Sequence, residues 1–392
     1  MNTTTPTLAL AATEARALIA DLSSAFRERE PEIRAVLLAT IAGEHVLLLG
    51  EPGTAKSAVT QAVATSVDWT GADDVVGRPY FSVLMTRYTT PEEVFGPVSL
   101  AGLERDEYRR VTDGYLPSCR VAFLDEVFKA NSAILNALLT VVNEREFDNG
   151  GQRVRVPLEV CIGASNELPE DDSLAALYDR FVLRRWVVGV RSRDSLRALL
   201  TTTAAPSTTA RLSHAALVVL RAAVDAVTLP DDVLDTLLEI RDTLAAEHGV
   251  TASDRRWRKI ARVVRAAAVL AGRTTCRRND LAVLTDCLWR RPDERAAIAG
   301  VVGDKAAPSA ALAQGFADAA HEVVVAVGPI DKATVQDRQG TMGLGSAASK
   351  LRAIRAEVED LDATEPGVAE VVEAVDGMLK AILRQTRAAL KL

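Results

Sequence analysis

Aromatic residues and positive net charge are both scarce in this sequence. Phe, Trp and Tyr make up only 4% of the 392 residues, which favours a core packed by aliphatic side chains and helices. The formal net charge is −7, whereas proteins whose main task is to grip nucleic acid are more often basic. Nucleic acid is therefore an unfavoured partner, although the overall charge leaves room for a local basic channel.

Closely spaced metal ligands, long apolar runs and a targeting segment are also missing. The spacing of the cysteines and histidines predicts neither a zinc site nor a disulfide framework. These residues are Cys119, Cys161, Cys276, Cys287, His45, His214, His248 and His321. No run of about 18 apolar residues could span a membrane, and the start of the chain shows no secretory pattern. We therefore expect a soluble, cytoplasmic protein with reduced thiols.

Short apolar runs alternate with helical patterns over the first 200 residues. The runs cover residues 45–49, 80–84, 121–124, 158–164 and 182–188. This alternation predicts an α/β fold with a mostly parallel sheet flanked by helices. Before the fourth run, residues 146–156 contain Asn149-Gly150, which predicts a β-hairpin with a two-residue turn.

The remainder of the chain has helical patterns only. Residues 201–210 resemble a linker, and helical patterns follow at 212–227, 231–247, 254–271 and 279–289. Glycines between 339 and 345 predict a break before a final helical pair, 347–361 and 368–390. We therefore expect an α/β domain at 1–200, an all-α domain at 201–300 and a helical C-terminal extension at 301–392.

A phosphate-binding loop follows the first apolar run. Such a loop, between a strand and a helix, turns its N–H groups toward phosphate at the helix N-terminus. The Lys neutralises the β- and γ-phosphates of ATP, and the Ser hydroxyl binds Mg²⁺. The usual Gly before this Lys is an Ala, which is tolerated if its backbone avoids positive φ. The loop consists of Gly50, Glu51, Pro52, Gly53, Thr54, Ala55, Lys56 and Ser57.

A second motif ends the third apolar run in two carboxylates, Asp125 and Glu126. In a parallel sheet this strand end lies beside the phosphate loop, where ligands collect. Adjacent carboxylates at a strand end point to opposite sides, so they can have separate roles. We expect Asp125 to order the Mg²⁺ shell and Glu126 to polarise the attacking water.

These motifs, together with several others, resemble the MoxR branch of the AAA+ ATPases, most closely its RavA-type members. The resemblance also rests on the Ala before the Lys and on residues 84–97, 123–136, 164–169, 178–181, 253–257 and 286–289. It covers about residues 8 to 300. No strands are evident for the β-rich domain that RavA-type proteins carry after the lid.

The resemblance implies roles for further polar residues. Asn166 corresponds to sensor 1, which orients water against the γ-phosphate, and Arg180 corresponds to the arginine finger that reaches a neighbour's nucleotide. The all-α domain corresponds to the lid, whose sensor-2 arginine is assigned to Arg255, with Arg256 as the alternative. Two further residues, Met85 and Tyr88, are either contacts for a substrate in the central pore of such a ring or buried packing residues.

The resemblance also implies a function and partners. The chain is expected to hydrolyse ATP with Mg²⁺, to form a homo-oligomeric ring, most simply a hexamer, and to remodel client proteins as a chaperone does. A protein with a von Willebrand A (vWA) domain is an implied partner.

Two other functions remain open. In a DNA translocase of the helicase type, the hairpin with Arg145, Arg153 and Arg155 would follow the nucleic-acid backbone. In a nucleotide-gated switch, slow hydrolysis would only control partner binding, although Glu126 and Asn166 argue against an inactive site.

Overall fold

The computed structural model describes residues 7–70, 72, 79–169, 172–202, 206, 208–328, 338–361 and 368–390. Its backbone contacts divide the chain into two compact units. The first contains Met1–Leu234 and His248–Arg295, and the second contains Asp235–Glu247 and Ala296–Leu392.

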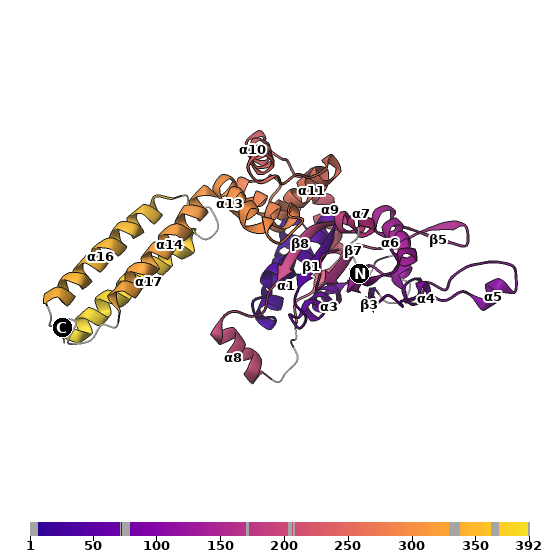
Figure 1. The fold of residues 1–392 in the computed structure, drawn as a ribbon, viewed down its shortest axis with the longest axis horizontal. Helices are drawn as coiled ribbons and strands as arrows, with labels where there is room; N and C mark the ends of the chain where they lie inside the picture. Colours follow the sequence, from indigo (N-terminus) through magenta and orange to yellow (C-terminus); the bar gives the residue numbers. More distant parts are fainter. Residues whose placement is uncertain are drawn as a thin grey trace. The chain divides into compact units, whose positions relative to one another are not determined.

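A five-stranded parallel sheet lies at the centre of the first unit (Figure 1). Its strand order is β3-β4-β7-β1-β8. The strands are β1 (His45–Gly50), β3 (Tyr80–Leu84), β4 (Val121–Asp125), β7 (Val160–Ser165) and β8 (Phe181–Val187). We call the edge where β1 begins the amino edge and the edge where β1 ends the carboxyl edge. The predicted α/β parallel-sheet fold is confirmed.

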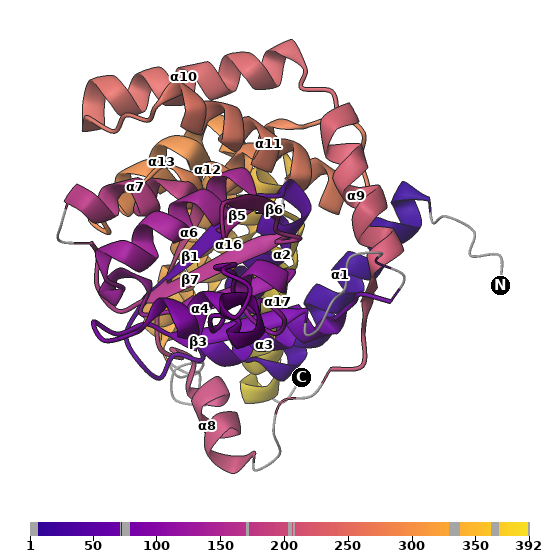
Figure 2. The ribbon, with the colours of Figure 1, turned by 90° about the vertical axis from the view of Figure 1, so that its right-hand side faces the viewer.

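Helices pack against this sheet and against one another. Helix α2 packs against β1 and β8, and α1 lies beside α9 (Figure 2). Pro31 occupies the first turn of α2, and Gly43 ends the helix with φ 69°, a left-handed conformation that favours glycine. The helices are α1 (Leu8–Ala25), α2 (Glu30–Ala42), α3 (Lys56–Ser66), α4 (Pro91–Phe95), α5 (Leu100–Leu103), α6 (Ser132–Glu144), α7 (Asp172–Arg180), α8 (Arg193–Thr201), α9 (His214–Ala226), α11 (Asp254–Leu270) and α12 (Leu284–Cys287).

The smaller strands include the expected hairpin, with its turn shifted by one residue. Strands β5 (Glu146–Asn149) and β6 (Gln152–Arg155) pair antiparallel, and β2 (Val67–Asp68) pairs with β9 (Leu212–Ser213). Asn149 pairs with Gln152, so the turn is Gly150-Gly151 rather than Asn149-Gly150. Both glycines have positive φ, as a type I′ turn requires. The Asn149 side chain instead binds the backbone N–H and C=O of Arg110.

One helical prediction in the first unit needs correction, and one helix of this unit was not predicted. Residues 279–289 do not form one helix, because a 3₁₀ segment at Arg278–Val283 precedes the short α12. Asp280 fixes this segment by accepting hydrogen bonds from the Arg277 backbone N–H and the Arg273 guanidinium. Helix α8 lies just before the expected linker and was not predicted.

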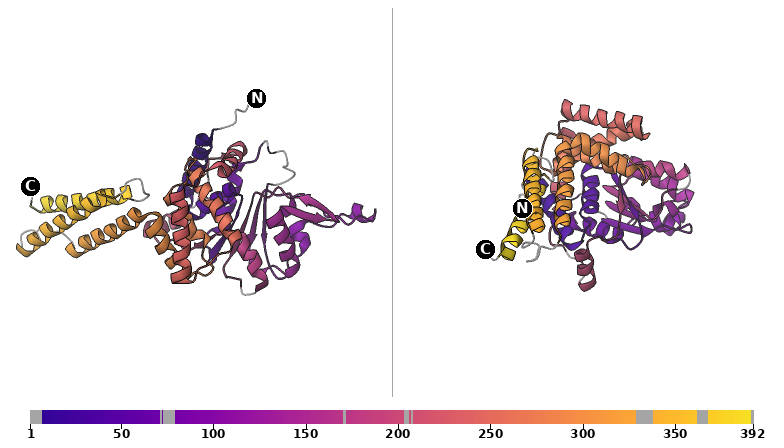
Figure 3. Two further views of the ribbon diagram at one scale, coloured as in Figure 1. Left: turned by 90° about the horizontal axis from the view of Figure 1, so that it is seen from above. Right: turned by 60° about the vertical axis from the view of Figure 1, so that its left-hand side comes forward.

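The second unit contains three long helices that run alongside one another (Figure 3). Their small apolar residues form a common core, which includes Ala320, Leu344, Ala348 and Leu351. The predicted break at 339–345 is wrong, because these glycines lie inside α16 and burial of its apolar face outweighs the cost of about 1 kcal/mol per glycine. The long helices are α14 (Pro308–Val327), α16 (Arg338–Glu359) and α17 (Val368–Leu390), with α13 (Glu294–Ala306) before them and α10 (Asp231–His248) divided between the units.

Candidate active site

The phosphate loop connects β1 to α3 at the carboxyl edge. Gly50 has φ 142°, and a Cβ there would lie 2.1 Å from the Val187 carbonyl oxygen, so only glycine fits. Gly53 and Ala55 also have positive φ, at 77° and 67°. Here one residue of ordinary backbone conformation, Thr54, lies between two left-handed residues. Such an arrangement points neighbouring N–H groups toward a common side, where an anion can bind.

Ala55 departs from the condition expected of it. We expected the methyl group to be tolerated only if the backbone avoided positive φ. The observed φ of 67° and ψ of 20° instead lie in the left-handed region. For a residue with a Cβ, this conformation costs about 1 kcal/mol. The loop therefore retains a glycine-like backbone at this position despite the substitution.

Lys56 is buried beneath the loop, with a relative exposure of 8%. Its Nζ donates to the carbonyl oxygens of Gly50 and Glu51, at 2.7 and 2.8 Å, and to Asn166 Oδ1 at 3.1 Å. Burial lowers the pKa of Lys56, and the nearby Asp125 partly opposes this shift. The ammonium group thus has neutral hydrogen-bond partners and retains a positive charge to offer a phosphate.

The two carboxylates at the end of β4 have different surroundings. Asp125 Oδ2 accepts from Ser57 Oγ at 3.3 Å, and these hard oxygen ligands suit Mg²⁺. Glu126 has φ 50° and accepts from Asn166 Nδ2 at 2.5 Å. Its other oxygen lies 3.3 Å from Lys129 Nζ. The residues present therefore fit a magnesium nucleotide, with Asp125 and Ser57 as the candidate metal ligands and Glu126 held separately.

Arg29 is a further residue of this region that the sequence reasoning missed. Its Nε donates to the Thr54 carbonyl oxygen at 3.0 Å, and its Nη2 donates to that of Val188 at 2.8 Å. The guanidinium thereby joins the phosphate loop to the end of β8. No local motif surrounds Arg29, so only the folded arrangement identifies it.

Arg180 and Arg255 lie at the other end of the sheet. Arg180 directly precedes Phe181, which pairs with His45 at the start of β1. Arg255 donates to Asn143 Oδ1 at 3.2 Å, and the adjacent Val142 carbonyl bonds His45. The length of β1 places this region roughly 17 Å from the phosphate loop. The four predicted catalytic residues therefore form two groups, with Glu126 and Asn166 together at the carboxyl edge.

The two arginines at the amino edge influence each other electrostatically. Burial lowers the pKa of Arg180, and the charge of Arg255 lowers it further. Arg180 pairs only loosely with a carboxylate, since Asp179 Oδ2 lies 3.8 Å from Arg180 Nη1. This weakly compensated pair favours a nearby anion.

Arg256, the alternative to Arg255, has a different environment. It is only 3% exposed, and it donates to the carbonyl oxygens of Cys287 and Val182. The pairing of β1 with β8 skips Val182, which leaves that carbonyl available. Arg256 therefore connects α11 to β8 and α12, whereas Arg255 is exposed beside it.

Arg184 and Arg185 also have structural partners. Arg184 is 1% exposed and donates to the Trp289 carbonyl oxygen at 2.5 Å, and Arg185 pairs with Asp286 at 2.8 Å.

The two candidates for pore contacts differ in exposure. Met85 is fully buried, whereas Tyr88 is 89% exposed. Of these two, only Tyr88 can contact another molecule.

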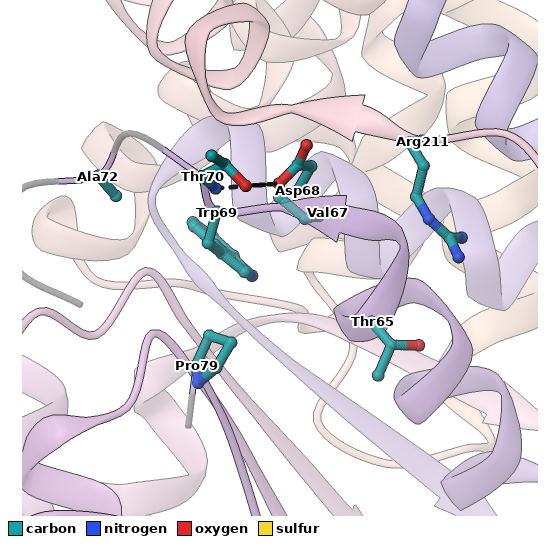
Figure 4. Close-up of a pocket in the computed structure, with 8 residues that line it drawn as sticks. All are labelled: Thr65, Val67, Asp68, Trp69, Thr70, Ala72, Pro79 and Arg211. Carbon is teal, nitrogen blue, oxygen red and sulfur yellow. Dashed lines mark hydrogen bonds between the residues drawn. The ribbon is translucent and has the colours of Figure 1, made fainter. Parts of the chain in front are cut away.

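A separate pocket of about 540 Å³ lies at the far end of α3 (Figure 4). Thr65 and Trp69 line it, and Asp68 accepts hydrogen bonds from the backbone N–H and hydroxyl of Thr70. Thr65 is nine residues beyond Lys56 on α3, so the two are about 14 Å apart along the helix. This pocket is distinct from the phosphate loop.

The parallel sheet, the phosphate loop and the carboxylate-ended strand together define a P-loop protein of the AAA+ type. Residues 13–228 match a family described as the MoxR domain in the MoxR-vWA-beta-propeller ternary systems. Residues 232–302 match an AAA lid domain. The chain belongs to the MoxR family of AAA+ ATPases, as its motifs indicated.

Two archaeal proteins are similar to this chain over most of its length. The uncharacterized protein MJ0812 of Methanocaldococcus jannaschii is 42% identical over 283 residues, covering 70% of this chain and 71% of the relative. A second protein of that organism, uncharacterized protein MJ0079, is 38% identical over 285 residues, or 72% of each chain.

The crystal structure of a putative ATPase from Cytophaga hutchinsonii has a similar fold. Its TM-score is 0.60 at 18% identity, and the match covers 76% of this chain and 96% of that one. Within the residues that the structure describes, no helix is both long and apolar enough to cross a membrane. The family, the lid match and the fold together support an ATP-driven activity.

Proposed function

We propose that this protein hydrolyses ATP with Mg²⁺ at the carboxyl edge. Lys56 would contact the β- and γ-phosphates, and Ser57 and Asp125 would hold Mg²⁺, which would neutralise phosphate charge. The loop residues 50–55 bind the phosphates through their N–H groups. The observation that carries the proposal is the position of Glu126, which Asn166 holds beside Lys56 of the phosphate loop.

Glu126 acts as the water-activating carboxylate. Its bond from Asn166 aligns one oxygen, and the same amide side chain accepts from Lys56. Asn166 therefore connects the phosphate-binding cation to the base. Such an arrangement lets Asn166 orient the attacking water against the γ-phosphate, which is the role assigned to sensor 1.

The active site is completed by a second subunit. Arg180 and Arg255 lie at the amino edge, too far from their own phosphate loop to reach its nucleotide directly. In a closed ring each subunit would present these arginines to its neighbour, where they stabilise charge on the transferred phosphoryl group. A ring of six copies is the proposed assembly, with 201–300 as the lid between the α/β domain and the extension.

Turnover in this ring drives the remodelling of client proteins. The family description names vWA proteins as part of its ternary systems, so a vWA protein is the proposed partner of this chain. The exposed Tyr88 is the side chain we assign to client contact. The proposed compartment is the cytoplasm, which supplies ATP and keeps thiols reduced.

ATP turnover measured against protein concentration tests this proposal. We expect turnover per subunit to rise cooperatively with concentration and to fall about 100- to 10,000-fold in Glu126→Gln, while ATP binding persists. Lys129→Gln, which removes only the exposed partner of Glu126, is the matched control and should retain most activity. Hydrolysis by Glu126→Gln at the wild-type rate contradicts the assigned base.

The same assay with single-stranded DNA separates the two motor functions. Arg153 in the hairpin is paired with Glu144 and Glu146, at 3.3 and 3.2 Å, which does not favour a phosphate contact. We expect no DNA stimulation. A several-fold, salt-sensitive rise in turnover would instead establish the translocase.

A further inference from the structure

A second polar pocket, of about 450 Å³, lies at the amino edge of the sheet. Its walls come from the residues before β4 and β7, the end of α6, the end of β6, and helices α9 and α11. Five arginines line it, namely Arg120, Arg145, Arg155, Arg221 and Arg262. Arginine side chains are rarely buried unless they are paired with another group. Five guanidinium groups around one pocket are therefore unusual.

Only two carboxylates, Glu159 and Asp225, are among the lining residues. Glu159 is shared, because it pairs with Arg120 at 2.9 Å and also with Arg221. Asp225 pairs with Arg262. The lining residues therefore carry an excess of three positive charges.

Two of the arginines have no carboxylate partner among the described residues. Arg145 donates from Nη2 to the Gly43 carbonyl oxygen at 3.1 Å, and its buried Nη1 has no hydrogen-bond partner in the described part of the chain. Arg155 is exposed at the end of β6, and the register of the hairpin places Glu146 opposite it. The carboxylate of Glu146 is paired with Arg153 instead.

The crowding of these charges has an electrostatic consequence. The pKa of Arg221 is lowered to about 10, first by burial and then by the charges of Arg145, Arg262 and Arg120. Repulsion among like charges of this kind is relieved when an anion enters. Guanidinium groups bind phosphate through paired hydrogen bonds, which makes them the usual residues for this ligand class.

The pocket is separate from the phosphate loop. Gly43 lies two residues before β1, at the amino edge, so the length of β1 separates the pocket from Lys56.

The pocket lies near Arg255 along α11, because Arg262 is seven residues, or two helical turns, beyond Arg255. Because residues i and i+7 share a helix face, a ligand held by Arg262 contacts the same face of α11 that carries Arg255.

We propose that this arginine pocket is a binding site for a small anion with two or more phosphate groups, independent of the ATP site. Its volume lies within the range of small-molecule pockets. The shared chemistry is a compact polyphosphate, which either an inorganic chain or a nucleoside polyphosphate supplies. The inference does not depend on the proposed ATPase activity.

Calorimetric titration with inorganic tripolyphosphate tests the proposal. The full-length chain carries Lys56→Ala, which removes the phosphate-loop cation, and circular dichroism verifies its fold. We expect one site per subunit with micromolar affinity. Adding Arg155→Gln or Arg262→Gln should weaken binding about tenfold each. Arg153→Gln, on the same strand but outside the pocket, is the matched control and should change affinity less than twofold.

The sources of the ligand are separated by competition. The competitor is a metal-free nucleoside triphosphate of equal charge. If it displaces tripolyphosphate at a concentration below that of tripolyphosphate itself, the pocket is a nucleotide site. If it displaces tripolyphosphate more weakly, the pocket is an inorganic polyphosphate site. Both support a small-polyphosphate pocket. Equal weakening by Arg153→Gln and Arg155→Gln, no binding below about 1 mM, or stronger binding of a single-stranded oligonucleotide overturns the proposal.

Discussion

The two edges of the central sheet differ in how their charges are compensated. At the carboxyl edge, Lys56, Glu126 and Asn166 form one hydrogen-bonded network, and Lys129 pairs with the same glutamate. At the amino edge, Arg180 and Arg255 lie together with little compensation. One edge is therefore organised within the subunit, whereas the other has positive charge that suits an anion from another molecule.

Under the proposed function, this difference would correspond to a catalytic site shared between subunits. The phosphate loop and Glu126 would come from one subunit, and the arginine that stabilises the transferred group would come from its neighbour. On this proposal, assembly is the step that brings the two edges together.

Removing Arg180 is expected to have the largest effect. Arg180→Ala should lower ATP turnover about 1,000- to 100,000-fold at saturating protein, the range measured for arginine fingers. Arg255→Ala should lower it less, by about 100-fold. Nucleotide binding by isolated subunits should be unchanged in both, because neither side chain lies near its own phosphate loop. A loss of binding in the isolated Arg180→Ala subunit would contradict the division between the edges.

Arg255 and Arg256 form a natural pair for separating function from stability. Arg256→Met leaves the buried carbonyls of Val182 and Cys287 without a donor, and should reduce the free energy of unfolding by about 3 kcal/mol. Arg255→Met, one residue away and exposed, should change it by less than about 0.5 kcal/mol. Urea unfolding followed by circular dichroism measures both. Equal destabilisation by the two substitutions would contradict the structural role of Arg256.

The amino edge also makes stability depend on pH through His45. This histidine accepts from the Cys161 backbone N–H and bonds the Val142 carbonyl, and burial holds its pKa well below the usual 6.5. The unfolded chain therefore takes up a proton below pH 6.5 that the folded chain does not. The contribution of His45 to the free energy of unfolding is therefore fully present above pH 6.5. It decreases as the pH drops below this value, by up to about 1.4 kcal/mol per pH unit.

Unfolding titrations between pH 7.5 and 5.5 measure this dependence. His45→Gln should flatten the slope, whereas His248→Gln, at an exposed helix end, should leave it as in the wild type. An unchanged slope in His45→Gln assigns the pH dependence to other groups.

The smallest expected effect concerns the phosphate loop itself. Ala55→Gly removes the left-handed strain at φ 67° but gives the unfolded chain more freedom. We expect a net gain of about 0.5 kcal/mol and a turnover within about twofold of the wild type. Thermal unfolding and a turnover assay measure the two quantities. A loss of stability would mean that the methyl group makes favourable contacts.

The strands of the central sheet could be predicted because each is an uninterrupted apolar run that ends in a turn or in charge, whereas their order in the sheet was not predicted. The predicted strand at 80–84 coincides with β3, and the motifs at Lys56 and Asp125 do lie together. Tertiary packing determined what the sequence could not show. The glycines of α16 are helical because Leu344 and Ala348 are buried, and the hairpin turn shifted because Asn149 bonds Arg110.

The site shows the same limit. Neighbouring arginines at 255 and 256 are indistinguishable by pattern, and only burial separates them. Arg29 and the arginine pocket gather residues from distant parts of the chain. No local spacing records such assemblies, so their chemistry becomes visible only after folding.

Mixing two inactive variants tests the central claim most directly. Glu126→Gln subunits keep Arg180, and Arg180→Ala subunits keep an intact phosphate loop and base. If each active site is shared between two subunits, a mixture should recover ATP turnover well above either variant alone, up to about a quarter of the wild-type rate at equal amounts. If Arg180 acts only within its own chain, the mixture remains as inactive as its components, and the proposed division between the two edges is wrong.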